Sequence, residues 1–121
     1  MVKTPQEIEV WYVLPAIRRE LALELKRTGK SQKEISEILD ITKAAVSQYL
    51  KNKRGNDVQF GKEILDKIKQ SASNILRNPD DLFGEYKIII NMVQKTKLLC
   101  KLHKKYGHEK ENCRACFVVN V

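Results

Sequence analysis

The 121-residue sequence contains no long run of apolar residues. Its longest apolar stretch, residues 11–17, includes Pro15 and is far shorter than the roughly 20 residues that a membrane-spanning helix needs. The first residues, 1–5, also lack the charged, apolar and small-residue regions of a signal peptide. These absences predict a cytoplasmic protein with no membrane partner. In that compartment we expect the three cysteines to stay reduced, so a disulfide framework is not predicted.

Glycine is scarce and scattered, which counts against catalysis. The five glycines do not cluster into a loop that could cradle a phosphate; they are Gly29, Gly55, Gly61, Gly84 and Gly107. The sequence also offers no Ser-His-Asp set and no pair of carboxylates in a recognisable frame. An enzyme is therefore not expected.

Basic residues are abundant. Lysine and arginine number 23 against 15 aspartates and glutamates, which gives a net charge of +8 and a pI near 9.5. So basic a short chain favours polyanionic partners, although a lysine-rich surface that only confers solubility has the same composition. The 42% of hydrophobic residues is enough to bury a core. Charge alone does not separate the two interpretations.

The spacing of apolar residues predicts an all-α fold of five helices. The first helix begins at a capping box formed by Thr4 and Glu7, is interrupted or kinked at Pro15, and stops at Gly29. The fourth helix ends at residues 78–79, where the fifth begins. The fifth helix is expected to turn six apolar side chains inward, namely Leu82, Phe83, Tyr86, Ile89, Ile90 and Val93.

Residues 31–50 carry the pattern of a helix-turn-helix unit. Two short helices are predicted, from Gln32 to Leu39 and from Lys43 to Leu50. Ser31 opens a capping box before the first helix, and Thr42 caps the second.

The connection between these two helices has the residues that a tight crossing requires. Ser36 is small, as a close approach of two helices demands. Asp40 stands in the turn where glycine is usual, and we expect it to adopt a positive φ, which aspartate tolerates better than most residues. The apolar residues expected at the crossing are Ile35, Leu39, Ile41, Val46 and Leu50.

The outer face of the second helix is predicted to enter the major groove of DNA. Gln48 can pair bidentately with adenine, Lys43 can reach guanine or a phosphate, and Ala44 can touch a thymine methyl group. Helix N-termini and nearby cations can hold phosphates. An ordinary helical hairpin with a solvated basic face is the alternative. The predicted contacts are Ser31, Gln32, Lys33, Thr42, Lys43, Ala44, Ser47, Gln48, Lys51, Lys53 and Arg54.

The sequence resembles a family of archaeal predicted transcriptional regulators whose helix-turn-helix is similar to that of the λ-repressor and Cro group. The similarity extends over residues 9–21, 31–35 and 44–50, and residues 41–51 (ITKAAVSQYLK) are its most specific part. It implies a λ-repressor-like DNA-binding domain, residues 1–78, followed by a short metal-binding extension that contributes to dimerisation. It also implies a homodimer that binds a palindromic operator in double-stranded DNA.

The C-terminal segment, residues 79–121, contains all three cysteines in a pattern typical of metal sites. Cys100 and His103 form a C-x2-H pair, and Cys113 and Cys116 form a C-x2-C pair. These four side chains can bind zinc in a closed structural site, or the three thiolates alone can hold an iron–sulfur cluster. One buried cysteine and two incidental thiols are a third possibility. Spacing alone slightly favours zinc.

Similarity to archaeal regulators of iron–sulfur metabolism favours a cluster, of the 3Fe-4S or 4Fe-4S type, held by Cys100, Cys113 and Cys116. Relatives often carry a further C-x2-C pair just before the position of Cys100, but residues 88–94 contain no cysteine here. The resemblance thus implies a regulator, in the simplest case a repressor, that senses iron–sulfur or redox status. The alternatives are a DNA-binding regulator with a structural zinc site, or a cluster-carrying protein that docks an acidic partner.

Overall fold

The computed structural model describes Thr4, Glu7 and residues 9–96. This part of the chain is all-helical and contains no strand, which confirms the predicted all-α class. None of its helices has both the length and the hydropathy that crossing a lipid bilayer requires. In chain order, the elements are the π-helical turn η1 (Glu9–Val13), α2 (Leu14–Arg27), α3 (Gln32–Leu39), α4 (Lys43–Leu50), α5 (Lys62–Arg77), the 3₁₀ turn η2 (Pro79–Asp81) and α6 (Leu82–Lys95).

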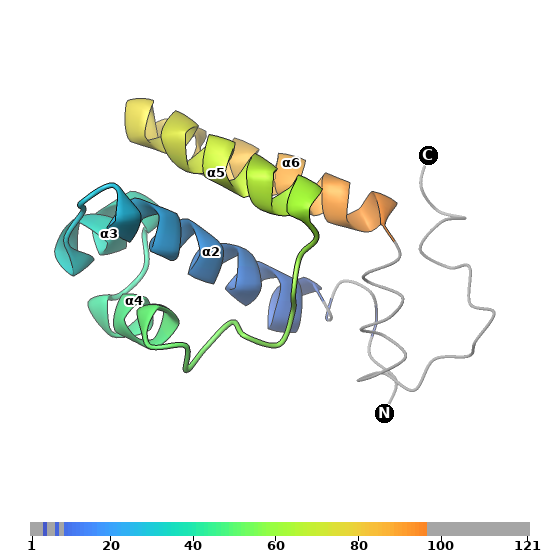
Figure 1. Ribbon diagram of the computed structural model, residues 1–121, viewed down its shortest axis with the longest axis horizontal. Helices are drawn as coiled ribbons and strands as arrows, with labels where there is room; N and C mark the ends of the chain where they lie inside the picture. Colours follow the sequence, from blue (N-terminus) through green and yellow to red (C-terminus); the bar gives the residue numbers. More distant parts are fainter. Residues whose placement is uncertain (1–3, 5–6, 8, 97–121) are drawn as a thin grey trace.

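α2 is the central helix, and the others pack around it (Figure 1). α5 and α6 run side by side along one side of α2, whereas α4 lies on the opposite side and α3 packs near the C-terminal end of α2. Ile17, Leu21 and Leu25 of α2 are fully buried and recur every fourth residue, so they share the face that meets the other helices. Burying each such side chain contributes about 1.5–3 kcal/mol to stability.

Thr4 and Glu7 form the predicted capping box. The Thr4 N–H donates to Glu7 Oε1 over 3.1 Å, and the Glu7 N–H donates to Thr4 Oγ1 over 3.2 Å. The π-helical turn η1 then gives way to α2 at Leu14, one residue before Pro15. Because Pro15 has no N–H to donate, it suits the first turn of a new helix but not the middle of a continuous one. The backbone stays helical at Val13 (φ −75°, ψ −49°), so the chain changes from a π-helical turn to an α-helix before Pro15 and does not break.

α2, α3 and α4 end in the same left-handed backbone stop. The residues that adopt it are Gly29 (φ +97°), Asp40 (φ +54°) and Asn52 (φ +59°). The N–H of each donates to the carbonyl three residues earlier, and the next N–H donates to the carbonyl five residues before its own position. The positive φ expected at Asp40 and the stop expected at Gly29 are confirmed. The sequence does not single out Asn52, although asparagine tolerates this conformation.

α5 and α6 are linked by an ion pair that is largely buried. Lys67 Nζ lies 3.5 Å from Glu85 Oε1, and the Asn74 side-chain amide donates to the same oxygen over 3.4 Å. Burial raises the pKa of Glu85, but the hydroxyl of Ser71, the Asn74 amide and the Lys67 charge together hold it below its ordinary value. The carboxylate is therefore ionised at neutral pH and holds the two helices together.

One residue of α6 departs from the predicted core. Leu82, Ile89 and Val93 are at most 5% exposed, and Tyr86 is buried with them, as expected. Phe83 is 73% exposed, so the inward orientation expected for it is wrong. Leu82, Tyr86 and Ile89 share one face of α6. Each step along a helix turns the side chain by about 100°, so Phe83 lies to the side of that face. At the start of α6 the neighbouring helices leave that flank uncovered.

Candidate nucleic-acid interface

α3 and α4 have the bounds that the sequence predicts, and both begin at side-chain caps. The Ser31 N–H donates to Glu34 Oε1 and the Glu34 N–H donates to Ser31 Oγ, each over 3.1 Å. The hydrogen bonds with Ser31, together with the Lys30 charge, hold the pKa of Glu34 below its ordinary value. Thr42 Oγ1 accepts from the Ala45 N–H over 3.0 Å. The caps fix where each helix starts, and other first-turn N–H groups have no partner within the helix.

The crossing of α3 and α4 is closed by apolar contacts around one small residue. Ile35 and Val46 are fully buried, and Leu39 is 2% exposed. Ser36 is buried as well, and its hydroxyl donates to the Lys33 carbonyl over 2.7 Å. A larger side chain at position 36 would push the two helices apart. The burial of Ile35, Ser36, Leu39 and Val46 is what the prediction requires, and α3 packs directly against α4.

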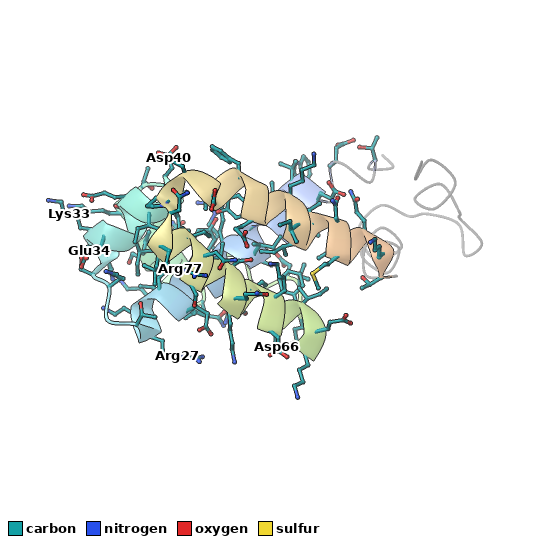
Figure 2. All side chains as sticks on the ribbon, turned by 90° about the horizontal axis from the view of Figure 1, so that it is seen from above. Arg27, Lys33, Glu34, Asp40, Asp66 and Arg77 are labelled. Carbon is teal, nitrogen blue, oxygen red and sulfur yellow. The ribbon has the colours of Figure 1, made fainter. Side chains whose placement is uncertain are left out.

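The exposed face of α4 and the loop after it carry eight of the eleven predicted contacts. Residues 43 and 47, and residues 44 and 48, are four positions apart and so share one face of the helix. The other three predicted contacts lie on the first turn of α3, where Lys33 points away from the body of the molecule (Figure 2). Ser47 is half-buried, and the exposed residues are Ser31, Gln32, Lys33, Thr42, Lys43, Ala44, Gln48, Lys51, Lys53 and Arg54.

The basic residues of α4 and of the loop after it are free of ion pairs in the described part of the chain. Residues 41–56 contain no acidic residue, and none of their four basic residues forms an ion pair within the described part of the chain. Ion pairs do form elsewhere, for example between Arg27 and Glu24 at 3.0 Å. Uncompensated charge of one sign attracts a polyanion. The four basic residues are Lys43, Lys51, Lys53 and Arg54.

The two neighbouring cations of the loop differ in how they are held. The guanidinium carbon of Arg54 lies 5.5 Å from the centroid of the Tyr49 ring, and Tyr49 is 1% exposed near the end of α4. Lys53 is exposed and has no such contact among the residues that the structure describes. Arg54 is therefore oriented by an aromatic face, whereas Lys53 is an exposed point charge.

Three residues that sequence reasoning missed attach the loop to α2. Arg19 Nε donates to Asn52 Oδ1 over 3.0 Å. Gly55 is buried at φ +75°, and a Cβ there would clash with the carbonyl oxygen of Pro15. The sequence could have indicated Asn52 and Gly55, because both residue types adopt a positive φ more readily than most. Nothing in the sequence indicates that Arg19 and Pro15 of α2 lie against them.

The predicted metal ligands lie outside the described residues. This applies to Cys100, Cys113 and Cys116, and to His103 of the zinc alternative. Over Thr4, Glu7 and residues 9–96, no three His, Cys, Asp or Glu side chains are grouped as a metal site would require. The iron–sulfur cluster and the zinc site both stay predictions from the sequence.

Comparison of the chain with protein-family models, with curated proteins and with solved structures found no match. The resemblance to archaeal regulators therefore stays a prediction from residues 9–21, 31–35 and 41–51 and from the spacing of the three cysteines. For function, the observations that carry weight are the geometry of α3 and α4 and the positive charge beside them.

Proposed function

We propose that this chain is a sequence-specific DNA-binding transcriptional regulator that reads the major groove with α4. The observation that carries the proposal is the exposed face of α4, where polar side chains and unpaired positive charge are presented by two capped helices that cross over a packed contact. An α-helix with its side chains is about 10–12 Å across, and the major groove is about 12 Å wide. α4 therefore has a size and a polarity that the groove accepts.

In this proposal Gln48 is the principal base contact, because its amide both donates and accepts and can pair with both groups on the adenine edge. Lys43 reaches guanine or a nearby phosphate, and Ala44 packs on a thymine methyl group. The first-turn N–H groups of α3 and α4 bind phosphates of the backbone. Lys53 and Arg54 add attraction that is independent of sequence.

The proposal includes a homodimer and a sensor. Two copies would place two α4 helices in half-sites roughly one turn of DNA apart, on a palindromic operator. A cluster held by Cys100, Cys113 and Cys116 would report iron–sulfur or redox status and change operator binding, with repression as the output. The support for this part is the cysteine spacing and the resemblance to archaeal regulators. A structural zinc site that includes His103 is the alternative.

Selection from a random duplex library, followed by gel shifts against competitor DNA, tests the DNA-binding proposal. The wild-type chain is expected to enrich one sequence and to bind it about 10³-fold or more tightly than random duplex. Gln48→Ala should relax the preference at one base pair, at a cost of about 1–3 kcal/mol. Lys53→Ala should weaken binding to all sequences alike. If no sequence is enriched, the proposed function is refuted. If a sequence is enriched but the two variants behave alike, the reading helix has been assigned wrongly.

Iron, sulfide and zinc content of anaerobically purified protein tests the sensor. A cluster requires about three or four irons per chain, whereas zinc without iron selects the structural alternative. Replacing Cys100, Cys113 and Cys116 together by serine should release the iron and change operator affinity. Equal affinity with and without the cluster would remove the sensing role and leave the DNA-binding proposal intact.

A further inference from the structure

We infer that Arg19, Asn52 and Gly55 are positioning residues that hold the loop of residues 51–56 as a preformed surface for the phosphates of duplex DNA. The inference rests on the proposed DNA-binding function and assigns a role to residues that need not touch DNA themselves. The loop contains no helix or strand, yet it is attached at both ends to α2.

Asn52 is the anchor at the start of the loop. Its backbone ends α4 at φ +59°, and its side-chain oxygen accepts a hydrogen bond of 3.0 Å from Arg19 Nε. The Asn56 side-chain amide closes the loop by donating to the Asn52 carbonyl over 3.0 Å. Arg19 also pairs with Glu20 at 2.7 Å, so its charge is already compensated. Arg19 therefore orients the loop and adds no free charge to the surface.

Gly55 is the anchor further along the loop. Its φ is +75°, and a Cβ at this position would clash with the Pro15 carbonyl oxygen and lie 3.1 Å from Arg19 Cβ. Only glycine allows two backbones to approach in this way. Pro15 lies in the first turn of α2 and Arg19 in the next, so one short stretch of a buried helix holds both anchors.

The anchored loop presents three cations in four consecutive positions, which are Lys51, Lys53 and Arg54. A loop whose backbone is fixed before binding avoids the entropy cost that ordering a free loop would add to association. Contacts from the loop to phosphates carry no sequence information themselves. The anchors therefore support the part of the DNA affinity that is independent of sequence.

The salt dependence of DNA binding by the full chain tests this inference, because the slope of log K against log salt counts phosphate contacts at about 0.9 per contact. Asn52→Gly keeps a residue that accepts positive φ and removes the acceptor for Arg19. Arg19→Gln replaces the guanidinium donor by a shorter side chain and removes one positive charge. Arg27→Gln is the matched control, since Arg27 is also on α2 and also pairs with a nearby glutamate, but lies at the opposite end of the helix. The probes are the duplex selected by the wild type and a random duplex of equal length.

Asn52→Gly and Arg19→Gln are each expected to reduce the magnitude of the slope by about 1 to 2. The loss of affinity between 50 and 200 mM salt should therefore be smaller than that of the wild type by a factor of about 4 to 16. The preferred sequence should not change. The double variant should lose no more than the stronger single variant, because both substitutions break one contact. Arg27→Gln should keep the wild-type slope.

Variants that are folded by circular dichroism and keep the wild-type slope would overturn the inference, and so would additive losses in the double variant. If Arg19→Gln does not fold, Asn52→Gly decides the question, because its backbone conformation is compatible with glycine. A wild-type chain that binds no duplex selectively would refute the proposed function instead. The two failures are therefore distinguishable.

Discussion

The two sides of α2 use their basic residues in different ways. On the side of α4, Lys43 and Lys53 are exposed and no acidic residue occurs between positions 41 and 56. On the side of α5 and α6, Lys67 is mostly buried and lies 3.5 Å from Glu85. The first arrangement leaves charge for an external polyanion, and the second uses it to hold helices together. The position of a lysine relative to carboxylates, more than the number of lysines, decides whether its charge stays free at the surface or joins two helices.

The largest effect is expected where the α4 side is attached to α2. Gly55→Ala should lower the free energy of unfolding by about 2–4 kcal/mol, because the new Cβ meets the Pro15 carbonyl at a backbone φ that alanine adopts poorly. Gly29→Ala is the control: its φ is also positive, but nothing lies within 4 Å of the added Cβ, so about 1–2 kcal/mol is expected. Equal losses in urea denaturation would show that the approach of Gly55 to Pro15 contributes nothing.

The next effect probes the opposite side of the molecule. Glu85→Gln should lower stability by about 1–3 kcal/mol, because it removes the charge that Lys67 and Asn74 stabilise. The folded variant should keep the DNA affinity of the wild type, because the Lys67–Glu85 pair lies on the side of α2 away from α4 (Figure 1). Asp66→Asn is the control, since Asp66 is exposed on α5 and points away from the helices (Figure 2). A loss of DNA affinity in folded Glu85→Gln protein would show that the α5–α6 side also contributes to DNA binding.

The same carboxylate predicts a direction for the pH dependence of stability. The pKa of Glu85 is lowered on folding, so its contribution is complete above the pKa of the unfolded chain, about 4.3, and is lost as pH falls through the folded value. Wild-type stability should therefore fall faster than that of Glu85→Gln as the pH is lowered from about 5. Parallel stability curves for the two proteins in that range would contradict the assignment.

The features that the sequence predicts well are those decided by near neighbours in the chain. Ser31 and Glu34 form their capping box across three residues, and Asp40 adopts its left-handed turn for reasons intrinsic to aspartate. The exposed face of α4 follows from helical periodicity in the same way. The all-α class and the bounds of α3 and α4 could therefore be predicted before any tertiary contact was known.

The features that escape prediction depend on residues far apart in the chain. Arg19 and Asn52 are 33 positions apart, and nothing in the sequence around either residue indicates that they form a hydrogen bond. Phe83 has the apolar character of a core residue, but whether it is covered depends on where α5 ends relative to α6. A one-dimensional pattern encodes which face of a helix is apolar, and it does not encode which neighbours reach that face.

A smaller effect is expected at the start of α3. Ser31→Ala should cost about 1 kcal/mol, because the Glu34 N–H loses its acceptor. Ser73→Ala provides the comparison, since Ser73 is exposed in the interior of α5, where alanine is the better helix former. That variant should be neutral or slightly more stable. Equal effects of the two substitutions on the denaturation midpoint would show that the cap adds nothing to stability.

The smallest effect is expected at Phe83. Phe83→Ser should change the free energy of unfolding by no more than about 0.5 kcal/mol, because the side chain is 73% exposed and folding removes little of its surface from water. Leu82→Ser, one position away and 5% exposed, should be far more destabilising. Denaturation at two protein concentrations adds a further distinction. If Phe83→Ser destabilises the protein only at the higher concentration, its ring is buried between two copies of the chain, and the α5–α6 side then carries an interface as well as a structural contact.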